Sequence, residues 1–178
     1  MKIKRNIFKL TFFVFILITF YNCKGTISTV TYSNSKIKNY KSAYIISSEN
    51  SEYIKFKFGE LSYGGYLPPK DYPAEKLKRI GNTDTIIKRE LEKYGILSII
   101  GKKGDTPENF DLIIKYTDKW RWDFKNILDE LKIYFISKEG NKILAKSTFN
   151  IYKNKELHNF PIPKKVVPKM IKELLDDR

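Results

Sequence analysis

The sequence has little of the residues from which many active sites are built. Its 178 residues include one cysteine, Cys23, and one histidine, His158. A single cysteine excludes a disulfide within the chain, so side-chain packing alone must hold the fold together. With a single histidine, a histidine metal cluster cannot form. His158 stands in the segment KELHNFPIP, between lysine-rich and proline-containing stretches, and we interpret it as a surface or packing residue.

The glycine motifs of phosphate-binding loops and serine hydrolases are missing as well. Gly59, Gly64 and Gly65 do not spell GxxxxGK, and the chain contains no GxSxG nucleophile turn. The sequence therefore predicts no cofactor and no metal site. Catalysis by two carboxylates is possible in principle, because paired acids can hydrolyse a glycoside.

The chain also lacks a long apolar run. Residues 10–21 are apolar apart from threonines, and this run is too short to span a bilayer core comfortably, which takes roughly 20 residues. The preceding residues are basic: Lys2, Lys4, Arg5 and Lys9. A basic start followed by a short apolar run is typical of a secretory signal, which we predict over residues 1–22.

Cys23 follows this run directly and has no thiol partner, which suits lipid attachment better than a disulfide. The region resembles a bacterial lipoprotein signal, in which a peptidase cuts before the cysteine and acyl chains such as palmitate are added to it. The resemblance implies a membrane protein anchored by lipid at Cys23 in the bacterial cell envelope, on the outer membrane and facing the periplasm. An uncleaved anchor and plain secretion are the alternatives.

The formal net charge is +14, but the lysines are scattered along the chain instead of forming a block. A basic balance can favour nucleic acid or anionic membrane surfaces. Lysine, isoleucine, asparagine, tyrosine and phenylalanine are abundant together, which is typical of a protein from an A+T-rich genome. We therefore predict no nucleic-acid partner, and we interpret the charge as an aid to solubility and to attraction by an anionic lipid surface.

The composition divides the chain behind the signal into two parts. Residues 23–40 have few large apolar side chains and predict a lipidated cysteine followed by a flexible tether. Residues 41–178 predict a single domain. Within it, residues 59–81 contain two glycine or proline pairs and form a long predicted loop, a kind of segment that often carries function.

Hydrophobic periodicity predicts the elements of this domain. Strands are expected at 42–48, 52–58, 96–100, 110–124, 131–137 and 142–152, and helices at 82–94 and 168–175. Adjacent hairpins favour antiparallel pairing. We therefore predict an α+β fold, a two-layer domain with a mainly antiparallel sheet and helices packed on one face.

Both tryptophans lie in the segment YTDKWRWDF, and strand alternation divides its residues between two faces. One face holds mostly apolar side chains: Leu112, Ile114, Tyr116, Asp118, Trp120, Trp122 and Phe124. We predict that the tryptophans are core residues and that Arg121 points outward. Asp118 is the charged exception on the apolar face, and it needs backbone donors or a lysine or arginine partner there. Asp123 is on the opposite face, near the following turn, which argues against a shared catalytic site.

The pattern Y-x-D-x-W-x-W-D is formed by Tyr116, Asp118, Trp120, Trp122 and Asp123. It is similar to a motif in small, uncharacterised bacterial envelope lipoproteins. That resemblance implies a compact sheet-and-helix domain behind a lipidated cysteine, and it brings no known activity, ligand or catalytic residue. We treat the five residues as a candidate structural or binding cluster.

The sequence thus favours a non-catalytic binding or adaptor protein of the envelope, whose partner is another envelope protein. A carboxylate-based envelope hydrolase is one alternative. A small-ligand binder that uses the aromatic loop 63–72, with Tyr63, Tyr66 and Tyr72, is another.

Overall fold

The computed structural model describes residues 27–33, 37–54, 61–62, 65–66, 75–105, 107–122, 125–139, 142–151 and 160–176. The predicted signal and Cys23 lie outside these ranges, as do Asp123, His158 and two tyrosines of the aromatic loop, Tyr63 and Tyr72. Within the described part, no helix has the length and apolar character needed to cross a membrane.

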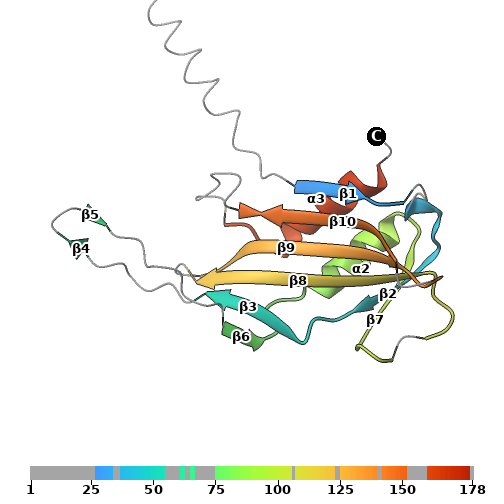
Figure 1. Cartoon of the computed structure of the whole chain (residues 1–178), viewed down its shortest axis with the longest axis horizontal. Coiled ribbons are helices and arrows are strands. Elements are labelled where there is room, and N and C mark those ends of the chain that lie inside the picture. Colours follow the sequence, from blue (N-terminus) through green and yellow to red (C-terminus); the bar gives the residue numbers. More distant parts are fainter. Residues whose placement is uncertain are drawn as a thin grey trace, which may run out of the picture.

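An eight-stranded mixed sheet forms one layer of the domain (Figure 1). Its main path runs β1 (Ile27–Thr31), β10 (Ile143–Asn150), β9 (Asn126–Ser137), β8 (Leu112–Trp122), β2 (Ser42–Ile46) and β7 (Leu97–Gly101). β3 (Asn50–Ile54) also pairs with β8, and β6 (Glu75–Lys78) pairs with β3. Two short strands, β4 (Leu61–Ser62) and β5 (Gly65–Tyr66), form a separate pair.

The direction of the strands changes across β8. The pairs from β1 through β10 and β9 to β8 are antiparallel, as the hairpins predict. On the other side of β8, both β2 and β3 are parallel to it, and β7 is parallel to β2. Parallel neighbours need a crossover connection, and α2 (Thr83–Lys93) lies in the connection that leads to β7.

The helices form the second layer, which confirms the predicted α+β architecture. Figure 1 shows α2 and α3 (Pro163–Leu175) on the same face of the sheet, where they contact one another. Their buried side chains meet the central strands in one continuous core, to which the middle of the sheet contributes Leu112, Ile114, Leu131, Ile133 and Phe135.

The C-terminal helix begins earlier than the predicted start at residue 168. Pro163 stands in its first turn, where no N–H is needed, and Pro168 lies inside the helix. An interior proline costs about 3 kcal/mol. Burial of an apolar stripe at helical spacing offsets this cost, and the stripe consists of Pro163, Val166, Val167, Met170, Ile171 and Leu175.

Part of the segment predicted as a tether, residues 23–40, belongs to the sheet, because residues 27–31 form β1. β1 pairs with β10 from Ile27 opposite Phe149 to Thr31 opposite Ala145. The η1 turn (Ile37–Asn39) also buries Ile37. An edge strand such as ISTVT needs only β-branched residues and one half-buried face, so it does not show the apolar run that marks a central strand.

Candidate functional site

The site lies where β8 exchanges one parallel partner for another. β2 pairs with β8 up to Ile46 opposite Lys115, and β3 resumes the pairing with Glu52 opposite Lys119. The residues between these two strands, 47–49, leave the sheet. As a result, the middle of β8, residues 116–118, has no parallel neighbour on this side.

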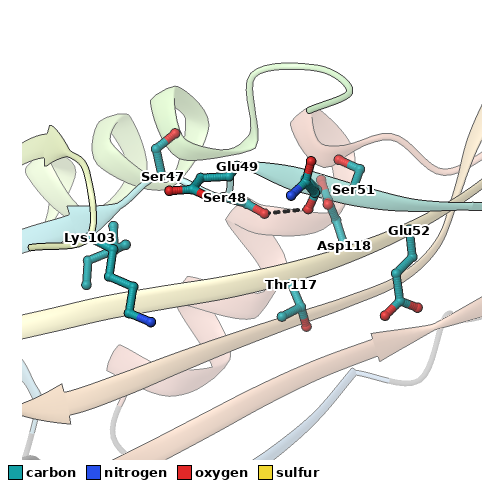
Figure 2. A pocket seen from close by; sticks show the side chains of 10 residues that line it. Ser47, Ser48, Glu49, Ser51, Glu52, Lys103, Thr117 and Asp118 are labelled. Atoms are coloured by element: carbon teal, nitrogen blue, oxygen red, sulfur yellow. Dashed lines mark hydrogen bonds between the residues drawn. The ribbon is translucent and has the colours of Figure 1, made fainter. Parts of the chain in front are cut away.

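A pocket of about 340 Å³ occupies this break in the sheet. Residues 46–52 line it together with Lys103, Thr117 and Asp118 (Figure 2). Its volume is at the lower end of the range found for small-molecule sites, about 300–1,000 Å³. Figure 2 shows Thr117 and Asp118 on opposite sides of β8, with Asp118 toward the segment that carries Ser48 and Ser51.

On the α2 side of the break, a buried acid is fully paired. Asp84, in the first turn of α2, is 2% exposed. It forms an ion pair with Arg79, and the Ser47 hydroxyl donates a hydrogen bond of 2.7 Å to its Oδ2. The Thr85 backbone N–H donates to its Oδ1, also at 2.7 Å. The positive end of the helix dipole adds to this stabilisation of the carboxylate.

Asp118 is just as deeply buried but has no such partners. It is 3% exposed, and neither carboxylate oxygen has a hydrogen-bond partner in the part of the chain that the structure describes. Burial raises the pKa of this carboxyl, while the Trp120 indole and the Ser51 hydroxyl act in the opposite direction. The charge of Arg79 acts in the same direction as these two groups, so of the partners expected from the sequence the carboxylate has a cation in its surroundings but no direct ion pair with it among the described residues.

Tyr116 and Trp120 flank Asp118 on the same face of β8. Burial raises the pKa of Tyr116 to about 12, with the charge of Asp84 as the second cause. The Tyr116 hydroxyl and the Trp120 Nε1 also have no hydrogen-bond partner within the described ranges. Trp120 is 3% exposed and packs beneath Gly81, where an added Cβ would meet its ring at 3.5 Å.

The end of β8 departs from the predicted alternation of core and surface. Trp122 is 38% exposed, so the prediction that both tryptophans are core residues is wrong for Trp122. Arg121 does not point freely into solvent either: its side chain is 13% exposed, and its Nε lies 3.2 Å from Oδ1 of the buried Asp129. The register between β8 and β9 shifts between Lys119 and Trp120, an irregularity that sequence alternation does not reveal.

The structure therefore brings together three of the five residues of the predicted cluster, Tyr116, Asp118 and Trp120. The sequence did not identify the segment Ser47–Ser51 or the Arg79–Asp84 pair as parts of the same site. The serines of SSENS, directly after a strand, were the one local signal of a polar turn. Nothing local places Arg79 next to Ser47, because their contact spans 32 positions of the chain.

The remaining chemistry of the site is that of a few acids and hydroxyls. Glu49 and Glu52, the other carboxylates of the pocket lining, are exposed. Among the described residues, no group of three or more histidine, cysteine, aspartate or glutamate side chains could hold a metal ion.

No protein-family model matches the sequence, and no curated protein matches it. Solved structures that resemble the chain include a PelC dodecamer from Paraburkholderia phytofirmans, with 11% identity, a TM-score of 0.47, and coverage of 85% of this chain and 96% of that chain. A DUF4136 family protein from Bacteroides thetaiotaomicron has 10% identity, a TM-score of 0.48, and coverage of 84% and 95%. A PDZ domain protein from Parabacteroides distasonis has 12% identity, a TM-score of 0.44, and coverage of 86% and 36%. Similarity at this level does not assign a function.

Proposed function

We propose that this protein is a lipid-anchored, non-catalytic binding protein of the bacterial cell envelope, and that its binding site is the pocket lined by Asp118. The observation that carries the proposal is a carboxylate that is 3% exposed, lines a pocket, and has no hydrogen-bond partner among the described residues. A buried charge of this kind is unfavourable for folding, so it needs an explanation outside the fold.

The arrangement of the pocket favours binding over hydrolysis. A carboxylate-based hydrolase uses two acids whose environments set different pKa values. In this pocket Asp118 is buried, whereas Glu49 and Glu52 are exposed, so the lining offers only one buried acid. The aromatic loop stays an alternative binding site, and of its three tyrosines only the backbone of Tyr66 lies in the described part.

The short distance from Cys23 to the domain supports a location at a membrane surface. Three residues, 24–26, separate Cys23 from Ile27, the first residue of β1, and the four steps along the chain span at most about 14 Å. α3 contacts β1 and carries exposed lysines at positions 164, 165, 169 and 172. Basic side chains close to an anchor are attracted to anionic lipid headgroups.

The anchor is tested by metabolic labelling with radioactive palmitate. The wild-type protein should incorporate the label and sediment with membranes, and Cys23→Ser should lose the label, since the chain has no other cysteine. Stable attachment to the membrane requires more than one acyl chain. Label that persists in Cys23→Ser, or that is never incorporated by the wild type, contradicts lipidation.

The pocket is tested by photo-crosslinking in living cells. A benzoylphenylalanine in place of Thr117, an exposed pocket residue, should give a defined adduct. The matched control carries the same photoreactive residue in place of Arg89, which is exposed on α2 and outside the pocket lining. The absence of an adduct at position 117, or the same adduct at both positions, would show that the pocket is not the binding site.

A further inference from the structure

We propose that the pocket binds a small molecule through a primary ammonium group, which forms an ion pair with the carboxylate of Asp118. This inference rests on the proposed function, because it assigns a chemical class to the ligand of the same pocket. It follows from a comparison of the buried acids in the described part of the chain and from the polar groups around Asp118.

Each of the other buried acids has a cation supplied by the fold. Asp84 pairs with Arg79, the carboxylate of Glu90 lies 2.7 Å from the Lys93 Nζ, and Asp129 lies 3.2 Å from the Arg121 guanidinium. Asp118 belongs to the same group by burial, yet it forms no ion pair among the described residues: the charge of Arg79 acts on it, but that guanidinium is paired with Asp84. A buried carboxylate without a cation is strongly disfavoured, so the missing partner is most simply a positive group that arrives with a ligand.

The lining of the pocket is also suited to a cation. It contains three carboxylates, Glu49, Glu52 and Asp118, against the single cation Lys103, in a chain whose net charge is +14. The Ser48 hydroxyl donates its proton to the Asn50 carbonyl oxygen at 2.7 Å, which leaves the Ser48 oxygen available as an acceptor. The pocket therefore offers a local negative potential together with neutral oxygen acceptors.

An ammonium group fits these partners better than a metal ion does. Its three N–H donors can be satisfied by one carboxylate and two neutral oxygens. A divalent metal prefers several converging carboxylate or imidazole ligands, and the described residues contain no group of three that could hold one. The small volume favours a compact amine, whether it is free or is the side chain of a lysine-containing peptide.

The test compares two probes of nearly equal size, butylammonium and 1-butanol, by NMR titration of the full-length protein in detergent micelles. Butylammonium should shift the amide signals of residues 47–52 and 117–119 in a saturable manner, and 1-butanol should bind at least ten times more weakly. A third probe, Nα-acetyl-lysine methylamide, distinguishes the sources of the amine. Tighter binding of this probe indicates a peptide, and weaker binding indicates a free amine.

The variants isolate the role of Asp118. Asp118→Asn should weaken butylammonium binding at least tenfold, since it keeps the shape and removes the charge. The matched control is Asp111→Asn, the same substitution at an exposed residue directly before β8. Its Oδ2 already accepts hydrogen bonds from the Lys41 and Ser42 backbone N–H groups and from the Ser42 hydroxyl. This control should bind like the wild type. If Asp118→Asn does not fold, Thr117→Phe, which adds a bulky ring to the pocket lining, should give the same loss of binding.

Two results overturn the inference: butylammonium that binds no better than 1-butanol, and butylammonium binding that Asp118→Asn and Thr117→Phe leave unchanged. If the adduct at position 117 is still formed in cells, the pocket remains a binding site and only the class of its ligand is wrong. If the adduct is absent as well, the proposed function fails.

Discussion

Asp84 and Asp118 are buried to the same degree, and the charges of both act on Tyr116, but their surroundings differ. Asp84 has an arginine, a hydroxyl and a backbone N–H as partners. Asp118 has no hydrogen-bond partner in the described part of the chain. The two carboxylates show that burial by itself does not tell whether the fold stabilises a charge or leaves it for another molecule.

The difference arises from the place of each acid in its element. Asp84 lies in the first turn of a helix, where free backbone N–H groups and the helix dipole are available and where Arg79 is only a few positions away. Asp118 lies in the middle of β8, opposite Leu131 of β9, and has no helix terminus to supply free N–H groups. Its partners would have to come from the neighbouring strand, and at this point β2 has ended and β3 has only begun to pair.

The largest effect is expected from removal of the ring that packs beside Asp118. Trp120→Ala should lower the free energy of unfolding by roughly 3–5 kcal/mol, because it empties a buried aromatic site. Trp122→Ala is the control, since this side chain is 38% exposed, and it should change stability by about 0.5 kcal/mol. Urea unfolding monitored by far-UV circular dichroism measures both values. Equal losses for the two variants would mean that Trp122 is a core residue after all.

The second prediction compares the effects on stability of replacing each of the two acids, Asp84 and Asp118. Near pH 7, Asp84→Asn should destabilise the domain by about 1–3 kcal/mol, because it removes the charge that Arg79 and Ser47 stabilise. Asp118→Asn should instead leave the free energy of unfolding unchanged or raise it by up to about 1–3 kcal/mol, since it removes a buried charge that has no partner. A loss for Asp118→Asn as large as that for Asp84→Asn would show that the fold does stabilise the Asp118 carboxylate.

The pH dependence of this prediction has a defined sign. The pKa of Asp118 is raised above its ordinary value of 3.8, so the folded protein keeps this proton at pH values where the unfolded chain has lost it. The protonated carboxyl therefore contributes fully to stability below about pH 4, which is the pKa of an aspartate in an unfolded chain. This contribution is lost as the pH rises through the higher pKa of Asp118 in the folded protein. The gain from Asp118→Asn should accordingly be seen near neutral pH and vanish in acid, as measured by melting temperatures across the pH range.

The smallest effect is expected at Tyr116, which is influenced by both acids. Tyr116→Phe should change the free energy of unfolding by about 0.5 kcal/mol or less near pH 7, because the hydroxyl makes no hydrogen bond in the described part. The pKa of Tyr116 is raised from 10.0 to about 12, so the fold opposes its ionisation and the wild type should lose stability as the pH rises through this interval. Tyr116→Phe should lose less stability than the wild type over the same pH interval. Its absorbance titration should lack a step near pH 12.

The part of the fold that could be predicted from the sequence is the part with strong local patterns. The alternating apolar residues of 110–124, the hairpin that follows, and the helix predicted at 82–94 correspond to β8, β9 with β10, and α2. β1 was missed because an edge strand buries only one face and resembles a polar linker. The first turn of α3 was missed because Pro163 resembles a loop residue until the buried stripe that follows it is known.

For the site, the sequence determined that Tyr116, Asp118 and Trp120 share the buried face of one strand, because a strand alternates its side chains with a period of two. It also determined the kinds of chemistry available, since one cysteine and one histidine leave carboxylates and hydroxyls as the main polar groups. Only the tertiary structure decided which of these groups would be paired. β2 ends before β3 begins, Arg79 lies against Asp84, and Arg121 forms an ion pair with Asp129, the residue of β9 at which the register with β8 shifts. Each of these contacts depends on the packing of residues that are distant in the chain or on an irregularity of the sheet, and neither leaves a periodic signal in the sequence.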